Sequence, residues 1–372
     1  MKVLESGNYI RTLMLLSVLF FSISPVGFVY ESFDKELHFI TIAFVCLALA
    51  SSSAKGTFRQ LAFTIWIAAG VTVGFTFHDS FLVFPEWVPG LGKMEMSVIF
   101  IPVLQVIMFA MGTTLSISDF TRAFKMPLGI IIGLCCQFTI MPLLGFALAH
   151  ALSLPVGIAA GLVLVGSSPS GLASNVMAFV AKANVAMSVT MTAFSTMLAP
   201  ILTPLLMKAL ADEMVEINVP SMMWSMAKIV LLPVLTGLVF HHLVYNRMKR
   251  LGPLMPVVSM IGILILTVLT VALGHDKLIQ VGLTLILACM IHSFAGFSLG
   301  YYVCKLLGRD QLTCRTIALE VGLQNSGMAA GLAQSLGKVT TLGLVPIVFG
   351  PVMNISASIL ANWWSNKPIE KS

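Results

Sequence analysis

The most informative stretch of this chain is residues 155–181, which read PVGIAAGLVLVGSSPSGLASNVMAFVA. It ends a longer run, 126–181, that holds no Asp, Glu, Lys or Arg. Since about 20 apolar residues suffice for a helix to cross the bilayer core, the run predicts two transmembrane helices that meet at Pro155. Inside the second helix, the small and helix-breaking residues 166–171 predict an interruption, because proline lacks an N–H and glycine loosens the backbone.

The composition of the whole chain agrees with a membrane protein. Of its 372 residues, 58% are hydrophobic and 10% are charged, and the mean hydropathy is +0.98. A soluble domain typically carries about 25% charged residues. The 21 Lys and Arg form no basic stripe, so the net charge of +6 does not indicate a nucleic-acid partner. The six cysteines have no CxxC spacing, so neither a disulfide framework nor a zinc site is indicated.

Runs without charge, and one run whose only charge is Glu320, predict a polytopic, all-α membrane protein. The twelve predicted helices are 12–30, 37–54, 61–77, 96–115, 127–150, 155–181, 184–206, 220–244, 253–274, 278–304, 313–336 and 339–363. With the N-terminus in the cytoplasm, fifteen Lys and Arg fall in inner segments, five in outer ones, and Lys228 lies within helix 220–244, which predicts cytoplasmic N- and C-termini in a cell inner membrane. Helix 12–30 has the alternative interpretation of a signal peptide, since Lys2 and Arg11 precede its apolar part.

The spacing of the helices predicts an internal repeat. The five helices that start at 61 are followed by five that start at 220, and the offset between matching starts stays between 151 and 159 residues. Since five is odd, the second copy must be inverted relative to the first, as in many secondary transporters. The predicted organisation is two N-terminal helices in 1–60, repeats in 61–210 and 211–366, and a cytoplasmic tail in 367–372.

A second interrupted helix is predicted at the matching place of the second repeat. Residues Glu320–Gly327 read EVGLQNSG and combine two glycines with a carboxylate and two amides inside an apolar helix. Non-helical backbone at membrane depth is tolerated where it lines a cavity or is buried in protein. A carboxylate there usually faces a cavity or a partner, so Glu320 is a candidate cation ligand. Its alternative is a neutral glutamic acid held by a hydrogen bond.

Neutral oxygens accompany this carboxylate in the sequence. Ser174 and Asn175 follow the first interruption, and Gln324 and Asn325 belong to the second. Ser188 and Thr192 are four residues apart and so share a helix face, although they could equally be interhelical hydrogen-bonding residues. Gln137 lies in the middle of helix 127–150, with the same two interpretations. One carboxylate among neutral oxygens suits a monovalent cation better than calcium.

Several motifs resemble the bile acid:sodium symporter family. They are Gly171-Leu-Ala-Ser-Asn-Val-Met177, Asn184-Val-Ala-Met-Ser188 with Thr192, Glu320-Val-Gly-Leu-Gln-Asn-Ser-Gly327, Gly112-Thr-Thr-Leu115 with Asp119-Phe120, and Asn354-Ile-Ser356. The resemblance covers about residues 61–366. It implies a panel domain of helices 61–77, 96–115, 220–244 and 253–274. The other six of the ten helices within residues 61–366 would form a core domain. The two interrupted helices would cross in the core, and helices 12–30 and 37–54 would be extra.

The resemblance also implies two sodium sites. The first would use Ser174, Asn175, Ser188, Thr192 and Glu320, and the second Gln137, Glu320, Gln324 and the backbone carbonyls of Val321 and Leu323. Asn175 and Asn325 would lie near the substrate. Ser168-Pro-Ser-Gly171, Leu172 and Met353 depart from patterns common in the family (Cys-Pro-Gly-Gly, a polar residue and a histidine), and all are expected near the substrate pocket.

The sequence thus predicts a symporter in the bilayer that imports a small organic anion with sodium by alternating access. Bile acids, pantoate and keto acids remain open as substrates. The alternative is a proton-coupled or uncoupled carrier, with Glu320 as the titrating group. A channel is disfavoured because the polar residues cluster midway along the helices. No nucleophile–base pair indicates an enzyme.

Overall fold

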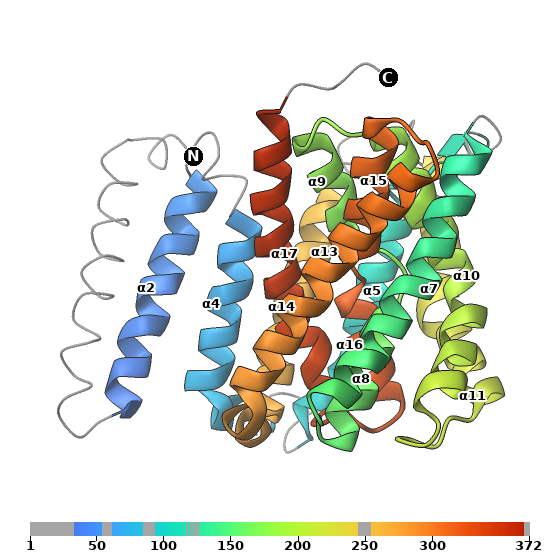
Figure 1. Ribbon diagram of the computed structural model, residues 1–372. Coiled ribbons are helices and arrows are strands. Elements are labelled where there is room, and N and C mark those ends of the chain that lie inside the picture. The colour runs from blue at the N-terminus through green and yellow to red at the C-terminus, as the bar shows by residue number, and fades with distance from the viewer. Residues whose placement is uncertain are drawn as a thin grey trace. The chain divides into compact units, whose positions relative to one another are not determined.

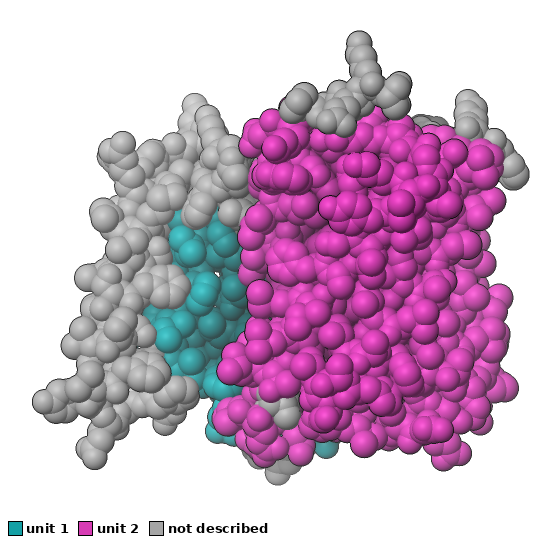
Figure 2. Space-filling model, in the orientation of Figure 1, with its two compact units in different colours: residues 1–98, 264–275 teal, residues 99–263, 276–372 magenta. Residues whose placement is uncertain are grey.

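The structure is a computed structural model that describes residues 33–53, 62–84, 94–116, 118, 119, 121, 126–244 and 254–367. The predicted helix 12–30, with its alternative of a signal peptide, lies outside these residues. Every named element among them is a helix. The chain forms two compact units, one of residues 1–98 and 264–275 and the other of residues 99–263 and 276–372 (Figure 2).

The first unit contains helices α2 (Phe33–Ser53) and α4 (Ala62–Thr76), which pack against each other. The hydroxyls of Thr41 and Thr76 lie 2.6 Å apart, and the indole N–H of Trp66 donates to Ser52. The part of α13 (Leu254–Leu273) that belongs to this unit approaches α4 at Gly74, where an added Cβ would lie 2.4 Å from the carbonyl oxygen of Val268. Small residues therefore set the spacing of this helix pair.

The second unit contains residues 254–263 of α13 and the remaining α-helices. They are α5 (Phe100–Gly112), α7 (Pro127–Ala151), α8 (Val156–Gly166), α9 (Ala173–Val180), α10 (Val185–Ala211), α11 (Val219–Met226), α12 (Leu232–Val244), α14 (His275–Leu306, from its second residue), α15 (Gln311–Gly322), α16 (Ser326–Ser335) and α17 (Leu344–Ser365). In Figure 1, α9 and α15 lie toward one end of this unit and α8 and α16 toward the other. The chain passes from α8 to α9 and from α15 to α16, so the two helix pairs run in opposite directions.

Most predicted helices match the structure to within a few residues; the predicted helix 184–206 ends five residues later, at Ala211 of α10, and two others differ as follows. The predicted helix 220–244 is α11 and α12 joined by a π-helical turn, η4 (Ala227–Leu231), just before Pro233. A proline has no N–H to give to the carbonyl four residues earlier, and a wider turn accommodates this. The predicted start of the last helix at residue 339 is wrong, because α17 begins at Leu344 after a turn closed by the N–H of Gly343 on the carbonyl of Lys338.

Five helices of the described residues are long and apolar enough to cross a membrane. They are α7, α10, α11 through α12, residues 282–306 of α14, and α17. Helices α8 and α9, and α15 and α16, fall below that length because each pair is one predicted helix that is interrupted. The length criterion therefore misses the two helices that the sequence predicts to be broken.

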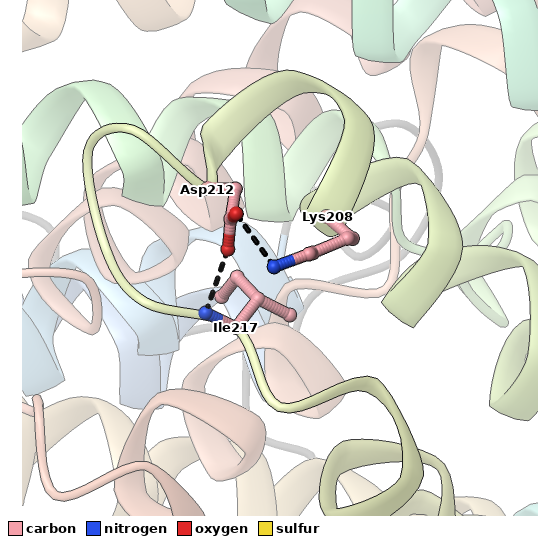
Figure 3. A network of polar contacts seen from close by, with 3 residues as sticks. All are labelled: Lys208, Asp212 and Ile217. Atoms are coloured by element: carbon pink, nitrogen blue, oxygen red, sulfur yellow. Dashed lines mark hydrogen bonds and ion pairs between the residues drawn. The ribbon is translucent and has the colours of Figure 1, made fainter.

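The connection from α10 to α11 is held by one carboxylate (Figure 3). Asp212 accepts a hydrogen bond of 2.6 Å from the ammonium of Lys208 and one of 3.0 Å from the backbone N–H of Ile217. The hydrogen bond from Lys208, followed by that from Ile217, lowers the pKa of Asp212 below its ordinary value. Both bonds stabilise the ionised carboxylate, which fixes the end of α10.

Candidate cation site between two interrupted helices

The first interruption separates α8, which ends at Gly166, from α9, which begins at Ala173. Pro169 lies in the middle of it, and the side chains of Ser167, Ser168 and Ser170 are buried. The Ser168 hydroxyl donates to the carbonyl of Leu164 and so satisfies one carbonyl at the end of α8. The break predicted at residues 166–171 is confirmed.

The second interruption is shorter. Helix α15 ends at Gly322, Leu323 and Gln324 follow, and Asn325 caps α16 by accepting a hydrogen bond from the N–H of Met328. Leu323 is extended, with φ −106° and ψ 96°. The break predicted within Glu320–Gly327 is thereby confirmed as well, and an asparagine at the N-cap explains why a new helix starts there.

The two interruptions bind each other through their backbones. The N–H of Asn325 donates to the carbonyl of Pro169 (2.8 Å), and the N–H of Gly171 donates to the carbonyl of Leu323 (3.0 Å). These bonds form an isolated antiparallel bridge between Ser170 and Gln324. A Cβ at Gly171 would lie 2.8 Å from the Gln324 carbonyl oxygen, so glycine is needed for this close approach. We call this arrangement, residues 167–172 with 323–325, the crossover.

A fully buried carboxylate lies next to the crossover. Glu320, on the last full turn of α15, accepts hydrogen bonds from the hydroxyls of Ser188 and of Thr192, the latter at 3.0 Å. The Asn175 Oδ1 lies 2.8 and 3.4 Å from the same two hydroxyl oxygens, each of which has one proton to donate, either to Glu320 or to Asn175. The Ser174 hydroxyl lies 3.3 Å from that of Thr192. The structure therefore brings together all five side chains that the family resemblance implies for the first sodium site.

Glu320 has no Lys or Arg within ion-pair distance among the residues that the structure describes. Removing an ionised carboxylate from water costs several kcal/mol unless a charge or strong hydrogen bonds compensate it. Two hydroxyls supply part of that compensation, and the remainder requires a bound cation or a proton. Sodium fits this donor set, since the three hydroxyls and the Asn175 Oδ1 beside the carboxylate are hard oxygens.

The second predicted set is brought together in part. The amide nitrogen of Gln137 donates to Gln324 Oε1 and to the carbonyl of Ser168, both at 2.8 Å. The amide nitrogen of Gln324 donates to the Val321 carbonyl at 2.6 Å. The Leu323 carbonyl accepts from Gly171, as described above. Glu320, the fifth member of this set, makes its hydrogen bonds to the first set instead.

One atom of this second set points to a ligand. Gln137 Oε1 is buried and has no hydrogen-bond partner within the described residues. A buried polar atom left unpaired costs roughly 1–3 kcal/mol. An amide oxygen is a suitable ligand for a hard cation, so a cation next to Gln137 would remove this cost.

The residues expected near the substrate lie around the crossover and on α17. Asn175 is half-buried on α9, next to Leu172, and Asn325 is buried at the start of α16. Met353 is buried on α17, one turn after Gly350. A Cβ added at Gly350 would lie 3.1 Å from the Ser326 hydroxyl. Asn325 thus belongs to the crossover and Asn175 follows it three residues after Leu172, whereas Met353 lies near the start of α16.

Sequence reasoning missed two residues that support the cluster. Arg315 is fully buried in α15, although it was counted among the cations of the inner segments. The Thr316 hydroxyl accepts a hydrogen bond of 2.9 Å from the N–H of Asn184, at the start of α10. The sequence carries a signal for Thr316 only, which precedes Glu320 by four residues and therefore shares its helix face.

The comparisons with known proteins agree on one family. Residues 101–281 match the model of the Sodium Bile acid symporter family. The chain is 38% identical over 315 residues to the "Uncharacterized sodium-dependent transporter YocS" of Bacillus subtilis (strain 168), covering 84% of this chain and 94% of that protein. It is 36% identical over 307 residues to the "Probable sodium/metabolite cotransporter BASS1, chloroplastic" of Arabidopsis thaliana, covering 82% and 73%. It is 30% identical over 278 residues to the "Ileal sodium/bile acid cotransporter" of Cricetulus griseus, covering 72% and 79%.

Proposed function

We propose that this chain, which belongs to the sodium bile acid symporter family, imports a small organic anion together with sodium. The observation that carries the proposal is the buried Glu320 carboxylate, surrounded by hydroxyl and amide oxygens and without a cationic side chain within ion-pair distance in the described residues. A sodium ion there would compensate the charge. The names of the relatives, which describe sodium-dependent transporters and cotransporters, support the choice of ion.

We infer two sodium sites from the two groups of oxygens. The first comprises Ser174, Asn175, Ser188, Thr192 and Glu320, which already form one hydrogen-bonded cluster. The second comprises Gln137, Gln324, Glu320 and the carbonyls of Val321 and Leu323. Its support is the unpartnered Gln137 Oε1. Because both sites share Glu320, an ion in one would alter the free energy of binding in the other.

The substrate would bind beside the crossover, where Asn175 and Asn325 offer amide groups and α9 and α16 begin. The N-terminus of a helix carries a partial positive charge, which favours a carboxylate or sulfonate. Leu172 and Met353 would shape the pocket for the remainder of the anion. A bile-acid-like, pantoate-like or keto-acid substrate is compatible with these groups.

We further propose that the chain is built from two inverted repeats, residues 61–210 and 211–366, whose core and panel helices move against each other in alternating access. The positions of four residues with positive φ, among those that the structure describes, support the repeat. Ser153 and Gly308 are 155 residues apart, and so are Lys182 and Gly337. Ser153 and Gly308 end α7 and α14, and Lys182 and Gly337 end α9 and α16. Equivalent helices therefore end alike in both proposed repeats.

The proposed location is the inner membrane, with both termini in the cytoplasm. The distribution of Lys and Arg supports this orientation. The predicted N-terminal helices 12–30 and 37–54 would be extra to the ten-helix pattern, and residues 367–372 a cytoplasmic tail.

A thermal-shift screen of organic anions tests the function directly, with the purified chain in sodium and in potassium buffer of equal ionic strength. A ligand that binds only the folded state stabilises it by RT ln(1 + [L]/Kd), or about 2.7 kcal/mol at one hundred times Kd. We expect an anion that raises the unfolding temperature in sodium and much less in potassium. Equal shifts in both buffers, or uptake into proteoliposomes that follows pH and ignores sodium, would favour the proton-coupled alternative.

A further inference from the structure

The turn between α9 and α10 joins the two helices that supply the neutral oxygens around Glu320. Helix α9 carries Ser174 and Asn175, and α10 carries Ser188 and Thr192. Only residues 181–184 separate the two helices, so the position of this turn controls how the four side chains face the carboxylate. The chain reverses direction at Lys182, which has φ +54°. The N–H of Lys182 donates to the carbonyl of Phe179, and the N–H of Ala183 donates to the carbonyl of Ala178.

Arg315 of α15 binds one side of this turn. Its Nη1 donates to the carbonyl of Ala181, which ends α9, and to that of Trp364 near the end of α17, each at 3.2 Å. Its guanidinium lies 5.9 Å from the Trp364 ring. The C-terminus of a helix carries about half a negative charge, so two such termini supply the counter-charge for one buried guanidinium. Its Nε and Nη2 have no hydrogen-bond partner within the described residues, which makes the two carbonyls its main polar contacts.

Thr316 binds the other side of the turn. Its hydroxyl accepts from the N–H of Asn184 (2.9 Å) and donates to the carbonyl of Leu312 in its own helix (2.8 Å). Asn184 is the N-cap of α10, where its side chain accepts from the N–H of Met187. The first turn of α10 is therefore fixed to α15 at this point.

Two contacts between α15 and α10 are then four residues apart on both helices. Thr316 contacts Asn184, and Glu320 contacts Ser188. Residues four apart lie on one helix face, about one turn from each other. The Thr316 contact therefore sets the register in which the carboxylate of Glu320 meets the hydroxyls of α10.

We propose that Arg315 and Thr316 are positioning residues, which hold the α9–α10 turn on α15 and thereby set the spacing of the oxygens around Glu320. The inference rests on the proposed function of that cluster as a sodium site. Neither residue belongs to the ligands of either proposed site. Their effect is expected on the affinity for sodium rather than on insertion or folding.

The test is a sodium titration of Thr316→Val and Thr316→Ser in the full-length chain, with potassium replacing sodium at constant ionic strength. The unfolding temperature and the sodium-dependent uptake are both measured. We expect Thr316→Val to raise the half-saturating sodium concentration about tenfold, equivalent to about 1.4 kcal/mol, because the Asn184 N–H loses its acceptor. Thr316→Ser, which keeps the hydroxyl, should stay within about twofold of the unsubstituted chain. Thr270→Val is the matched control, since that buried hydroxyl bonds the carbonyl of Leu266 in its own helix.

Arg315→Lys and Arg315→Met extend the test. A lysine keeps the charge, but its ammonium ends one bond short of the position of Nη1 and it has no flat guanidinium to face the Trp364 ring, so both variants should raise the half-saturating concentration. A lower unfolding temperature in potassium together with an unchanged sodium midpoint in Thr316→Val would overturn the proposal, because it would mark a purely structural role. If the unsubstituted chain itself fails to respond to sodium, the proposed function fails first and the inference falls with it.

Discussion

The two interrupted helices reach one crossover by different means. In α8–α9 the chain leaves the helix for six residues, and Leu172 at the start of α9 provides no side-chain cap. In α15–α16 only three residues intervene, and the Asn325 side chain caps the new helix. The buried carboxylate of Glu320 lies on the last turn of α15, just before the second, tighter break. The comparison suggests a division of roles, in which one break supplies neutral groups and the other holds the charge in a fixed position.

The helices that follow the breaks also differ in their surroundings. Helix α16 packs against α5, with Gly331 directly against the Leu104 side chain. Helix α9 packs against α10, α15 and α17 and leaves Val176 and Phe179 exposed by 59% and 74%. Among the described residues, the helix that follows the first break is therefore the more exposed of the two.

The largest effect is expected from removing the charge of the second break. In Glu320→Gln the shape of the side chain is kept and its charge is lost, so sodium-dependent uptake should be abolished. In potassium buffer the same variant should unfold at the same or a higher temperature, because an uncompensated buried charge costs several kcal/mol. Tracer uptake and thermal unfolding measure the two effects. Glu216→Gln, at an exposed position, is the control. Sodium-coupled uptake by Glu320→Gln would show that the negative charge of Glu320 is not needed for transport.

The backbone approach at the first break should give the next largest effect. In Gly171→Ala the new Cβ would meet the Gln324 carbonyl at 2.8 Å, whereas in Gly327→Ala the nearest atom would be 3.7 Å away. Overpacking against fixed backbone costs roughly 1–3 kcal/mol, so Gly171→Ala should lower the unfolding temperature and reduce transport. Gly327→Ala should leave stability unchanged or raise it, since alanine favours helix by up to about 1 kcal/mol over glycine. Similar losses in both variants would mean that the two breaks are equally close-packed.

Much of this comparison could be predicted from the sequence, and the reasons for the remainder are physical. Pro169 and the flanking glycines located the first break, because those residues oppose helix wherever they occur. The last helix was predicted to start directly after the charged Lys338, which is five residues too early. Gly337, at φ +66°, and the turn that follows it delay the start of α17 to Leu344. Arg315 could not be recognised as buried, because its partners are carbonyls from residues 181 and 364, which only tertiary structure brings together.

The starts of the two interrupted helices provide a smaller and pH-dependent test. Helix α15 is capped by Asp310, which accepts from the N–H (3.0 Å) and the hydroxyl (2.6 Å) of Thr313, whereas Pro155 at the start of α8 provides no side-chain cap. Partial burial alone would raise the pKa of Asp310, but the Thr313 hydrogen bonds outweigh it and the pKa is lowered. A lowered pKa stabilises the fold above the ordinary value of about 4, and this stabilisation is lost as the pH falls through the folded-state pKa.

Asp310→Ala should therefore destabilise the chain by about 1 kcal/mol at neutral pH. The difference from the unsubstituted chain should shrink on acidification, because protonation removes the same charge-assisted bonds. Asp310→Asn keeps an acceptor oxygen and should lose less at neutral pH. Thermal unfolding at neutral and at acidic pH measures both variants, and a difference that grows on acidification would contradict the assignment of the cap.

The smallest effect is expected where α9 and α16 end. Both helices end with a residue of positive φ, Lys182 in the first and Gly337 in the second, and each is followed by the same pair of backbone hydrogen bonds. Gly337→Ala should cost about 1 kcal/mol, since a side chain is strained in that conformation. Lys182→Gly relieves the same strain but gives up the hydrogen bond from the ammonium to the Ser365 carbonyl (2.9 Å) and adds chain entropy to the unfolded state. These contributions nearly cancel, so its unfolding temperature should change little, by an equivalent of at most about 0.5 kcal/mol. A clear gain in stability would show that the strain at Lys182 outweighs its bond to α17, and a clear loss would show that this bond holds the end of α9 in place.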